Sequence, residues 1–266
     1  MQAPAHWNRI EFLSDVHLHA KEPETARAWT SGLQTSTADA IFILGDLFEV
    51  WVGDDDDSEF VSSCLDTLKA TARQRAVYFL CGNRDFLIGA TFFQRTGIQA
   101  LDDPTVLDLG ACRLLLSHGD ALCLEDTEYL AFRTEVRSPA WQQAFLAKPI
   151  AERRAMAQYL REQSELRKKA MLASHSSHER QFQYADVDTP LAQQWLQEAN
   201  AQVLVHGHTH QPAEHALGVR DGQAQQRWVL SDWDARATPP RLERTVWQRK
   251  DIDNGRHGLS REPLKP

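Results

Sequence analysis

Three histidines at alternating positions follow a short apolar run in the stretch Val203-Leu204-Val205-His206-Gly207-His208-Thr209-His210. Imidazole is the commonest side-chain metal ligand in proteins. A glycine between two such residues lets the backbone and the neighbouring side chains crowd around one centre. A histidine loop on its own is more often solvated than metal-bound, so the motif needs support from elsewhere in the chain.

Four earlier stretches repeat this arrangement of an apolar run followed by a side chain that can bind metal. They are Asp15-Val16-His17 after residues 10–14, Gly45-Asp46 after residues 40–44, Gly82-Asn83 after residues 77–80, and Ser117-His118 after residues 113–116. Strands covered on both faces have continuous apolar sequences, and ligands of α/β sheets bind outside the carboxyl ends of the strands. We therefore expect an α/β fold that brings seven donors together: Asp15, His17, Asp46, Asn83, His118, His206 and His208.

Seven nitrogen and oxygen donors exceed the need of one tetrahedral site and predict two metals that share the carboxylate of Asp46. Carboxylate, imidazole and amide ligands without a thiolate favour Mn²⁺, Fe²⁺ or Zn²⁺. Two such ions clamp a phosphoryl oxygen and generate hydroxide near neutral pH, so the predicted chemistry is hydrolysis at phosphorus.

Each donor taken singly also has a structural explanation. An Asp just beyond a strand is often a helix N-cap, Asn83 could be a turn residue, and His118 could be a buried core histidine. The coincidence at five strand ends favours the metal site.

The rest of the chain supplies the elements that would position these donors. Helices are predicted over residues 22–37 and 58–73 from apolar positions at 3.6-type spacing, and residues 106–116 read as a hairpin. Residues 1–125 and 189–248 would form the core, with a last strand at 227–230. The polar tail, 249–266, is expected to be flexible.

Residues 126–188 contain no strand-like run, and their aromatic and aliphatic residues recur at helical intervals, which predicts a helical insertion. From Lys148 to Arg180 there are eight Lys or Arg residues against four Asp or Glu residues. A solvated helical face is the usual explanation of such charge. A cap with an apolar underside and a basic rim, suited to an amphiphile with phosphates, is the alternative, and the neighbouring metal motifs favour it.

Length and composition limit the class of protein. With 266 residues the chain can bury a sizeable core as one domain with an insertion. A net charge of −8 disfavours electrostatic binding to nucleic acid or to an anionic membrane. No apolar run approaches the roughly 20 residues that span a bilayer, and the N-terminus lacks a signal-peptide pattern. The four cysteines have no CxxC spacing, and we expect buried thiols in a cytosolic protein.

The five motifs together resemble those of the calcineurin-like metallophosphoesterase superfamily, in the same order, from about residue 10 to residue 235. The resemblance implies a four-layer α/β/β/α sandwich with the insertion as a cap. It also implies two ligand sets that share Asp46. The first metal would be held by Asp15, His17, Asp46 and His208, and the second by Asp46, Asn83, His118 and His206.

The residue after Asn83 departs from the general pattern of that superfamily. Many members carry a His there that can donate a proton, whereas this chain has Arg84. Arginine stays charged and cannot act as a general acid at neutral pH, but its planar fork clamps phosphate. We expect Arg84, with Asp46 and His118, to be catalytic, and Arg84 to hold a diphosphate and stabilise developing charge.

Residues 45–55, 82–87, 118–123 and 206–212 further resemble the family of UDP-2,3-diacylglucosamine pyrophosphohydrolases of lipid A biosynthesis. The resemblance implies water attack on the α-phosphorus of the substrate, which gives UMP and 2,3-diacylglucosamine 1-phosphate. It implies two Mn²⁺ ions per chain, a lipid-linked nucleotide substrate with no nucleic acid and no obligate protein partner, and peripheral contact with the cytosolic face of the inner membrane. The implied substrate contacts are Asn83, Arg84, Asp126, Ser164, Lys168, Arg180 and His206.

The insertion is where the chain departs from this family. Lys168 stands where relatives carry Asn, and residues 171–181 are lengthened. The family's phosphate-contacting Lys therefore aligns with Arg180 in preference to Met171. Asp234 falls where relatives often have His.

Two other classes of function compete with this interpretation. A cyclic-nucleotide phosphodiesterase or a protein phosphatase of the same fold is disfavoured by Arg84 and by the insertion. A binding scaffold that has lost its metals should have broken ligand motifs, and here all seven positions are filled. Peripheral membrane contact through the insertion remains reasonable.

Overall fold

Two β-sheets form the centre of the fold. The computed structural model describes residues 1–174, 186–220, 222–254 and 257–264, and the side chains of 164, 165, 167–174, 253 and 254 lie outside that description. The first sheet has the strand order β11 (Leu259–Pro263), β10 (Glu243–Gln248), β1 (Arg9–Leu13), β2 (Ala40–Leu44), β3 (Ala76–Leu80), β4 (Gln99–Ala100). The second has the order β5 (Thr105–Asp108), β6 (Arg113–Leu116), β7 (Val203–His206), β9 (Gln223–Val229), β8 (Glu214–Arg220).

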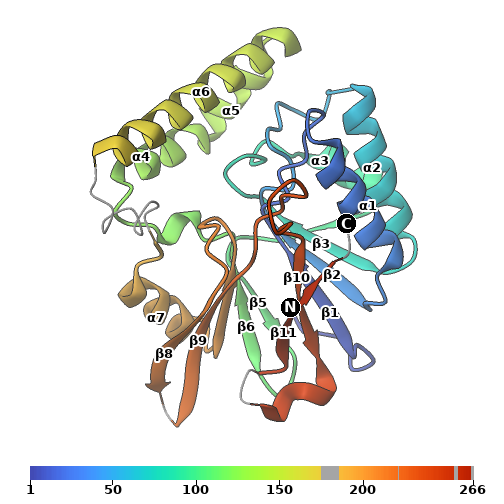
Figure 1. The fold of residues 1–266 in the computed structure, drawn as a ribbon, viewed down its shortest axis with the longest axis vertical. Coiled ribbons are helices and arrows are strands. Elements are labelled where there is room, and N and C mark those ends of the chain that lie inside the picture. The colour runs from blue at the N-terminus through green and yellow to red at the C-terminus, as the bar shows by residue number, and fades with distance from the viewer. Residues whose placement is uncertain (175–185, 221, 255–256, 265–266) are drawn as a thin grey trace.

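Helices cover the outer faces of both sheets. The first sheet is covered by α1 (Pro23–Thr35), α2 (Glu59–Ala72) and α3 (Ala90–Thr96), and the second by α7 (Thr189–Glu198) (Figure 1). Because side chains alternate across a strand, Ile41 and Ile43 of β2 pack in the helix-side core, while Phe42 and Leu44 pack between the sheets. The four-layer α/β/β/α sandwich implied by the resemblance is confirmed.

The core between the two sheets combines aliphatic side chains with a cluster of aromatic rings. Phe42 stacks on Phe12 and on Tyr78, with ring centroids 5.5 and 4.7 Å apart. Trp228 of the second sheet and Trp247 of the first are fully buried in the same core. Burial of large apolar side chains contributes about 1.5–3 kcal/mol each, so the strand ends rest on a rigid base.

The strands that precede the five motifs run in parallel pairs. In the first sheet Leu13 pairs with Ile43, and Leu44 pairs with Leu80, so β1, β2 and β3 end at one edge. In the second sheet Leu116 of β6 pairs with the penultimate residue of β7. A contact between a ring nitrogen of His118 and the carbonyl of Leu44, at 2.9 Å, joins the two edges. All five motifs therefore meet at one end of the sandwich.

Among the described residues, three α-helices lie between β6 and α7, in the segment expected to be helical. They are α4 (Thr127–Val136), α5 (Pro139–Leu146) and α6 (Ile150–Ser174), and they stand above the loops at the carboxyl ends of the strands (Figure 1). Asp126 caps α4 by accepting from the backbone N–H of Tyr129 at 3.0 Å. None of the described helices is both long and apolar enough to cross a membrane. We refer to α4, α5 and α6 together as the cap.

The C-terminal segment differs from the expectation of a flexible tail after a last strand at 227–230. Residues 243–248 and 259–263 form β10 and β11, an antiparallel pair that completes the first sheet, and Arg249–Asn254 form a 3-10 helix between them. Strand β11 is not predicted from the sequence because it lies at the edge of the sheet and has several polar, partly exposed residues. Its Glu262 forms an ion pair with Arg9, at 2.6 Å, where a buried strand would have apolar contacts.

Candidate metal centre

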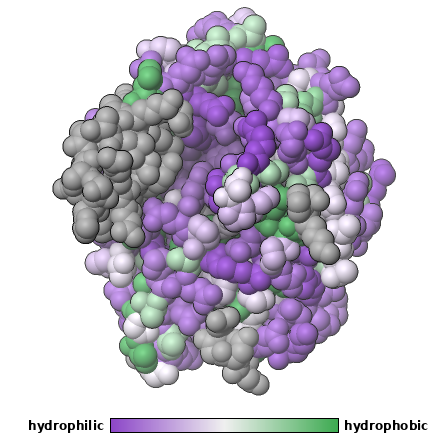
Figure 2. Space-filling view, in the orientation of Figure 1, coloured by the Kyte–Doolittle hydropathy of each residue, from purple (hydrophilic) through white to green (hydrophobic). Residues whose placement is uncertain are grey.

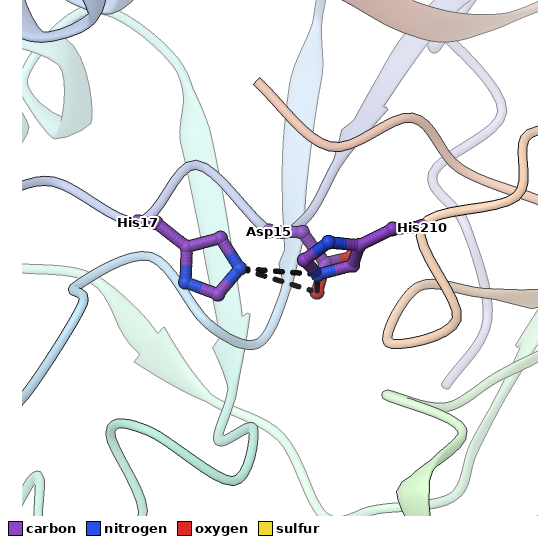
Figure 3. A group of neighbouring side chains, drawn as sticks. All are labelled: Asp15, His17 and His210. Carbon is purple, nitrogen blue, oxygen red and sulfur yellow. Dashed lines mark hydrogen bonds and ion pairs between the residues drawn. The ribbon is translucent and has the colours of Figure 1, made fainter. Parts of the chain in front are cut away.

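The loops after β1 and β7 bring three side chains together, which Figure 3 shows pointing toward one another. Nε2 of His210 lies 3.2 Å from Nε2 of His17 and 3.4 Å from Oδ1 of Asp15. Nε2 of His17 lies 4.0 Å from the same oxygen. The Asp15 side chain is fully buried. Its Oδ2 accepts from the Ser14 hydroxyl at 2.6 Å and from the backbone N–H of His208 at 2.9 Å, whereas Oδ1 has no hydrogen-bond partner among the described residues.

A second group forms around the amide oxygen of Asn83. This oxygen lies 2.9 Å from Nε2 of His118 and 2.8 Å from Nδ1 of His208. Because the Leu44 carbonyl can only accept, Nδ1 of His118 must donate to it, and Nε2 of the neutral ring then carries a lone pair. Oδ1 of Asp46 lies 3.6 Å from that Nε2. When the His118 ring is neutral, electron-pair donors therefore face one another, an arrangement that a cation stabilises in place of a proton.

The two groups adjoin through their carboxylates. Asp15, Asp46 and His118 each offer one ligand atom, and these atoms lie within 4.8 Å of one another. Asp46 is buried and follows the middle strand of the three that end at this edge. Its carboxylate thus lies beside Asp15 of the first group and His118 of the second, the position expected of a shared ligand.

The backbone at the site is unusually strained. Left-handed φ values of +51° to +66° occur at five of the site residues, which are Asp15, His17, Asp46, His208 and His210. Such a conformation costs about 1–2 kcal/mol per non-glycine residue, and it persists where the surrounding structure fixes it. Here the loops after β1 and β2 hold each other, since the Asp15 N–H donates to Gly45 O at 3.1 Å and the His17 N–H donates to Asp46 O at 3.0 Å.

Two glycines leave the space that the carboxylates occupy. A Cβ on Gly82 would lie 2.1 Å from Oδ1 of Asp46, and a Cβ on Gly207 would lie 2.2 Å from Oδ2 of Asp15. Both distances are far below van der Waals contact. Any side chain at either position would displace a carboxylate from the centre.

The charges of the site are strongly coupled. Burial opposes ionisation of Asp15, but His210, His118 and His17 hold its pKa far below the usual range. Burial disfavours the charged form of His118, yet Asp46 and Asp15 raise its pKa to about 9. Burial and the neighbouring His118 lower the pKa of His208 to about 3. Three features fit divalent cations: the buried carboxylates, which are stabilised by positive charge, the unpartnered oxygen of Asp15, and the set of nitrogen and oxygen donors.

Arg84 lies at the edge of this centre. Its backbone N–H donates to Oδ1 of Asp46 at 2.8 Å, which places the residue directly beside the shared carboxylate. Its side chain is 19% exposed, and its Nη1 lies 3.8 Å from Oε1 of Glu49. The Nε atom is buried without a hydrogen-bond partner among the described residues. The guanidinium is thus available to an anionic group that approaches the centre.

The three histidines after β7 are arranged differently from the sequence-based assignment. His208 lies in the group of Asn83 and His118, not in that of Asp15 and His17, where His210 lies instead. His206 belongs to neither group of described residues whose ligand atoms lie within 4.8 Å of one another. Its Nδ1 contacts the Gly207 carbonyl at 2.8 Å, and burial and Arg227 lower its pKa to about 4.

Strand length explains this shift, because His206 is still the last residue of β7. The other motifs place their first donor two or three residues beyond the strand. Asp15 follows Leu13, Asp46 follows Leu44 and His118 follows Leu116, each by two residues. The residue two positions beyond the end of β7 is His208, and the next histidine at an alternating position is His210. The spacing between strand end and donor is therefore the same in these motifs.

The residues expected to contact substrate through the cap are only partly described. Asp126 is exposed and caps α4. The side chains of Ser164 and Lys168 lie outside the described residues, as does Arg180 entirely. Substrate contact by these three residues therefore remains a prediction.

Asp120 is a site residue for which the sequence analysis predicts no role. Its carboxylate is buried and accepts from the hydroxyl of Tyr129 and, at 2.8 Å, from Nε of Arg133, both on α4. The Tyr129 ring lies 5.9 Å from the ring of His208. Asp120 thus ties the cap to the second group of donors. Its place directly after His118-Gly119 was the only sequence feature that pointed to it.

Comparisons with known proteins show which proteins the chain is similar to. The family model for the calcineurin-like phosphoesterases matches residues 9–212. A UDP-2,3-diacylglucosamine hydrolase of Chromobacterium violaceum is 43% identical over 231 residues, covering 84% of this chain and 90% of the relative. Proteins of the same name are similar in Aromatoleum aromaticum, with 43% identity covering 84% of this chain and 88% of the relative, and in Cellvibrio japonicus, with 41% identity covering 84% and 90%.

Proposed function

The chain belongs to the calcineurin-like phosphoesterase family, and within it to the UDP-2,3-diacylglucosamine hydrolases, and we propose that it hydrolyses the diphosphate bond of UDP-2,3-diacylglucosamine. The products would be UMP and 2,3-diacylglucosamine 1-phosphate. The observation that carries this proposal is the pair of adjoining donor groups around Asp46, with Arg84 beside them.

We propose Asp15, His17, Asp46 and His210 as the ligands of one cation, and Asp46, Asn83, His118 and His208 as the ligands of the other. Contacts among these side chains support each set. Mn²⁺ is the proposed ion, since carboxylate, imidazole and amide donors suit it. When bound, two divalent cations supply a Lewis acid for the phosphoryl oxygens and an activated water as nucleophile.

Binding of the diphosphate and stabilisation of its charge are the proposed tasks of a side chain of the protein. Arg84 would bind the diphosphate through its planar fork and stabilise the charge that develops on it. It cannot donate a proton at neutral pH. The reaction proposed here needs little proton donation, because the leaving group is a sugar phosphate whose oxygens accept charge readily.

The cap is the proposed site of the acyl chains and of peripheral contact with the cytosolic face of the inner membrane. Large apolar side chains are exposed along its helices, at Phe132, Leu146, Tyr159, Leu160 and Leu166. The face of the molecule in Figure 2 is mainly hydrophilic, with scattered apolar residues. Five of the nine large apolar side chains that are exposed among the described residues lie on the cap, and exposed apolar groups that gather on one part of a surface mark a lipid or partner site.

Turnover by the purified chain tests the proposal. The chain is expected to release UMP from UDP-2,3-diacylglucosamine, to require added Mn²⁺ after chelation, and to prefer this substrate over cyclic AMP and bis-p-nitrophenyl phosphate. Turnover of cyclic AMP at a higher kcat/KM would favour a phosphodiesterase of the same fold. Absence of both metal binding and turnover would identify a binding scaffold.

A further inference from the structure

The carboxylate of Glu49, in the loop after β2, touches groups from three parts of the molecule. Its Oε2 lies 3.3 Å from Nδ1 of His17. Its Oε1 lies 3.0 Å from Nε of Arg161, on helix α6 of the cap, and 3.8 Å from Nη1 of Arg84. The Glu49 side chain is only 11% exposed. One nearly buried carboxylate thus joins a proposed metal ligand, the proposed phosphate clamp and the cap.

The contact with His17 bears on which nitrogen of that ring can bind a cation. It is a close ion-pair contact and not an aligned hydrogen bond, since Nδ1 of His17 has no hydrogen-bond partner among the described residues. An ionised carboxylate beside Nδ1 can only accept, so it favours the hydrogen on Nδ1 and leaves Nε2 to present its lone pair. That lone pair is on the side of Asp15 and His210. A glutamate is ordinarily ionised at neutral pH, and this carboxylate also faces the guanidinium groups of Arg161 and Arg84.

The core, rather than the cap, fixes the position of Glu49. Its backbone N–H donates to Leu18 O at 3.2 Å, and the N–H of Trp51 donates to Arg84 O at 3.0 Å. These bonds hold the loop between the loop after β1 and the loop after β3. Arg161, by contrast, is 41% exposed and reaches Glu49 from α6. The contact between them depends on how α6 is seated on the core.

We propose that Glu49 is a positioning residue, which holds His17 and Arg84 in their working orientations and, through Arg161, makes those orientations depend on the docking of α6. The substrate in this proposal is that of the proposed function, but the effect on metal binding does not depend on the substrate. An isolated exposed ion pair is worth about 0–1 kcal/mol. The burial of Glu49 and its contact with a ligand histidine distinguish it from such a pair.

Mn²⁺ affinity of the metal-free protein, measured by calorimetry, tests the effect on His17. Glu49→Ala is expected to lower the affinity about 10–100-fold, the usual cost of removing an outer partner of a ligand histidine. Glu49→Asp keeps the charge but ends about 1.5 Å short, and we expect a comparable loss. Wild-type affinity in Glu49→Asp would overturn the positioning role, because it would show that charge alone suffices. Glu49→Gln, of the same volume, replaces Glu49→Ala if the latter lacks the wild-type circular dichroism spectrum.

A double-mutant cycle tests the link to the cap. Arg161→Ala is expected to lower kcat/KM about fivefold or more in the wild-type background and less than about twofold in the Glu49→Ala background. Arg154→Ala is the matched control, because Arg154 lies on the same helix and pairs with Asp56 at 2.6 Å, away from Glu49. Its effect should be equal in both backgrounds.

Equal effects of Arg161→Ala in the two backgrounds would overturn the link to the cap. If UDP-2,3-diacylglucosamine is not turned over, bis-p-nitrophenyl phosphate serves as the substrate of the cycle. In that case the proposed function fails, while the Mn²⁺ affinities of the Glu49 variants still decide the role of Glu49.

Discussion

A single methyl group at Gly207 should disable the metal centre. The added Cβ would lie 2.2 Å from Oδ2 of Asp15 and 2.3 Å from Oγ of Ser14. To restore ordinary contact, Asp15 must move by about 1 Å, which breaks its bonds to the Ser14 hydroxyl and the His208 N–H. A 1 Å misplacement at a catalytic site costs about 100-fold, which is about 2.7 kcal/mol of transition-state free energy. Overpacking should also lower the free energy of unfolding by about 1–3 kcal/mol.

The assay for Gly207→Ala is kcat/KM for UMP release at saturating Mn²⁺, together with the Mn²⁺ affinity of the metal-free protein. Gly32→Ala is the control, because the added Cβ in α1 would meet the flexible end of the Leu264 side chain at 3.0 Å and Trp233 at an ordinary contact distance of 3.8 Å. The control should retain wild-type activity. If Gly207→Ala keeps kcat/KM within threefold and binds Mn²⁺ normally, the carboxylate of Asp15 is not held as described and the reasoning fails.

Three further predictions concern single side chains. His210→Ala should lower Mn²⁺ affinity at least about tenfold, whereas His206→Gln should leave it within about threefold; calorimetry on both variants would contradict the histidine assignment if the order were reversed. Arg84→Ala should fold and bind Mn²⁺ but lose about 100-fold or more in kcat, and unchanged steady-state kinetics would leave Arg84 without a role. Arg153→Ala should lower the free energy of unfolding in urea by about 1.5–3 kcal/mol, since its buried guanidinium donates to Val52 O at 2.6 Å and to Asp55; a loss no larger than that of Arg154→Ala would refute this.

The family and the layered fold could be predicted from the sequence because both depend on short-range patterns. The apolar run 40–44 coincides with β2, and the helix expected at 58–73 is α2, at 59–72. The family assignment is confirmed by the comparisons. Such patterns persist because buried parallel strands need continuous apolar sequence. The edge strand β11 has no continuous apolar sequence, so the sequence predicts a flexible tail at this position.

The arrangement of the site could be predicted only as far as strand ends can be located. His206, His208 and His210 have the same side chain and alternate along one short stretch. Which two of them face the metal centre depends on where β7 ends. Glu49 contacts Arg161 of α6, which lies more than 100 residues further along the chain. Asp120 contacts Arg133 of α4, the first helix of the cap. No local pattern encodes which arginine of a basic helix reaches which carboxylate. These contacts require the packed structure.

The number of Mn²⁺ ions bound per chain, in wild type and in Asp46→Ala, tests the central claim most directly. The carboxylate of Asp46 lies beside Asp15 of one donor group and beside His118 of the other, and we propose that both ions share it. The wild-type protein should therefore bind two ions, and the variant should bind fewer than two and release no UMP. Two tightly bound ions and normal turnover in Asp46→Ala would contradict the shared centre. Metal content and product release measured on the same sample decide between these results.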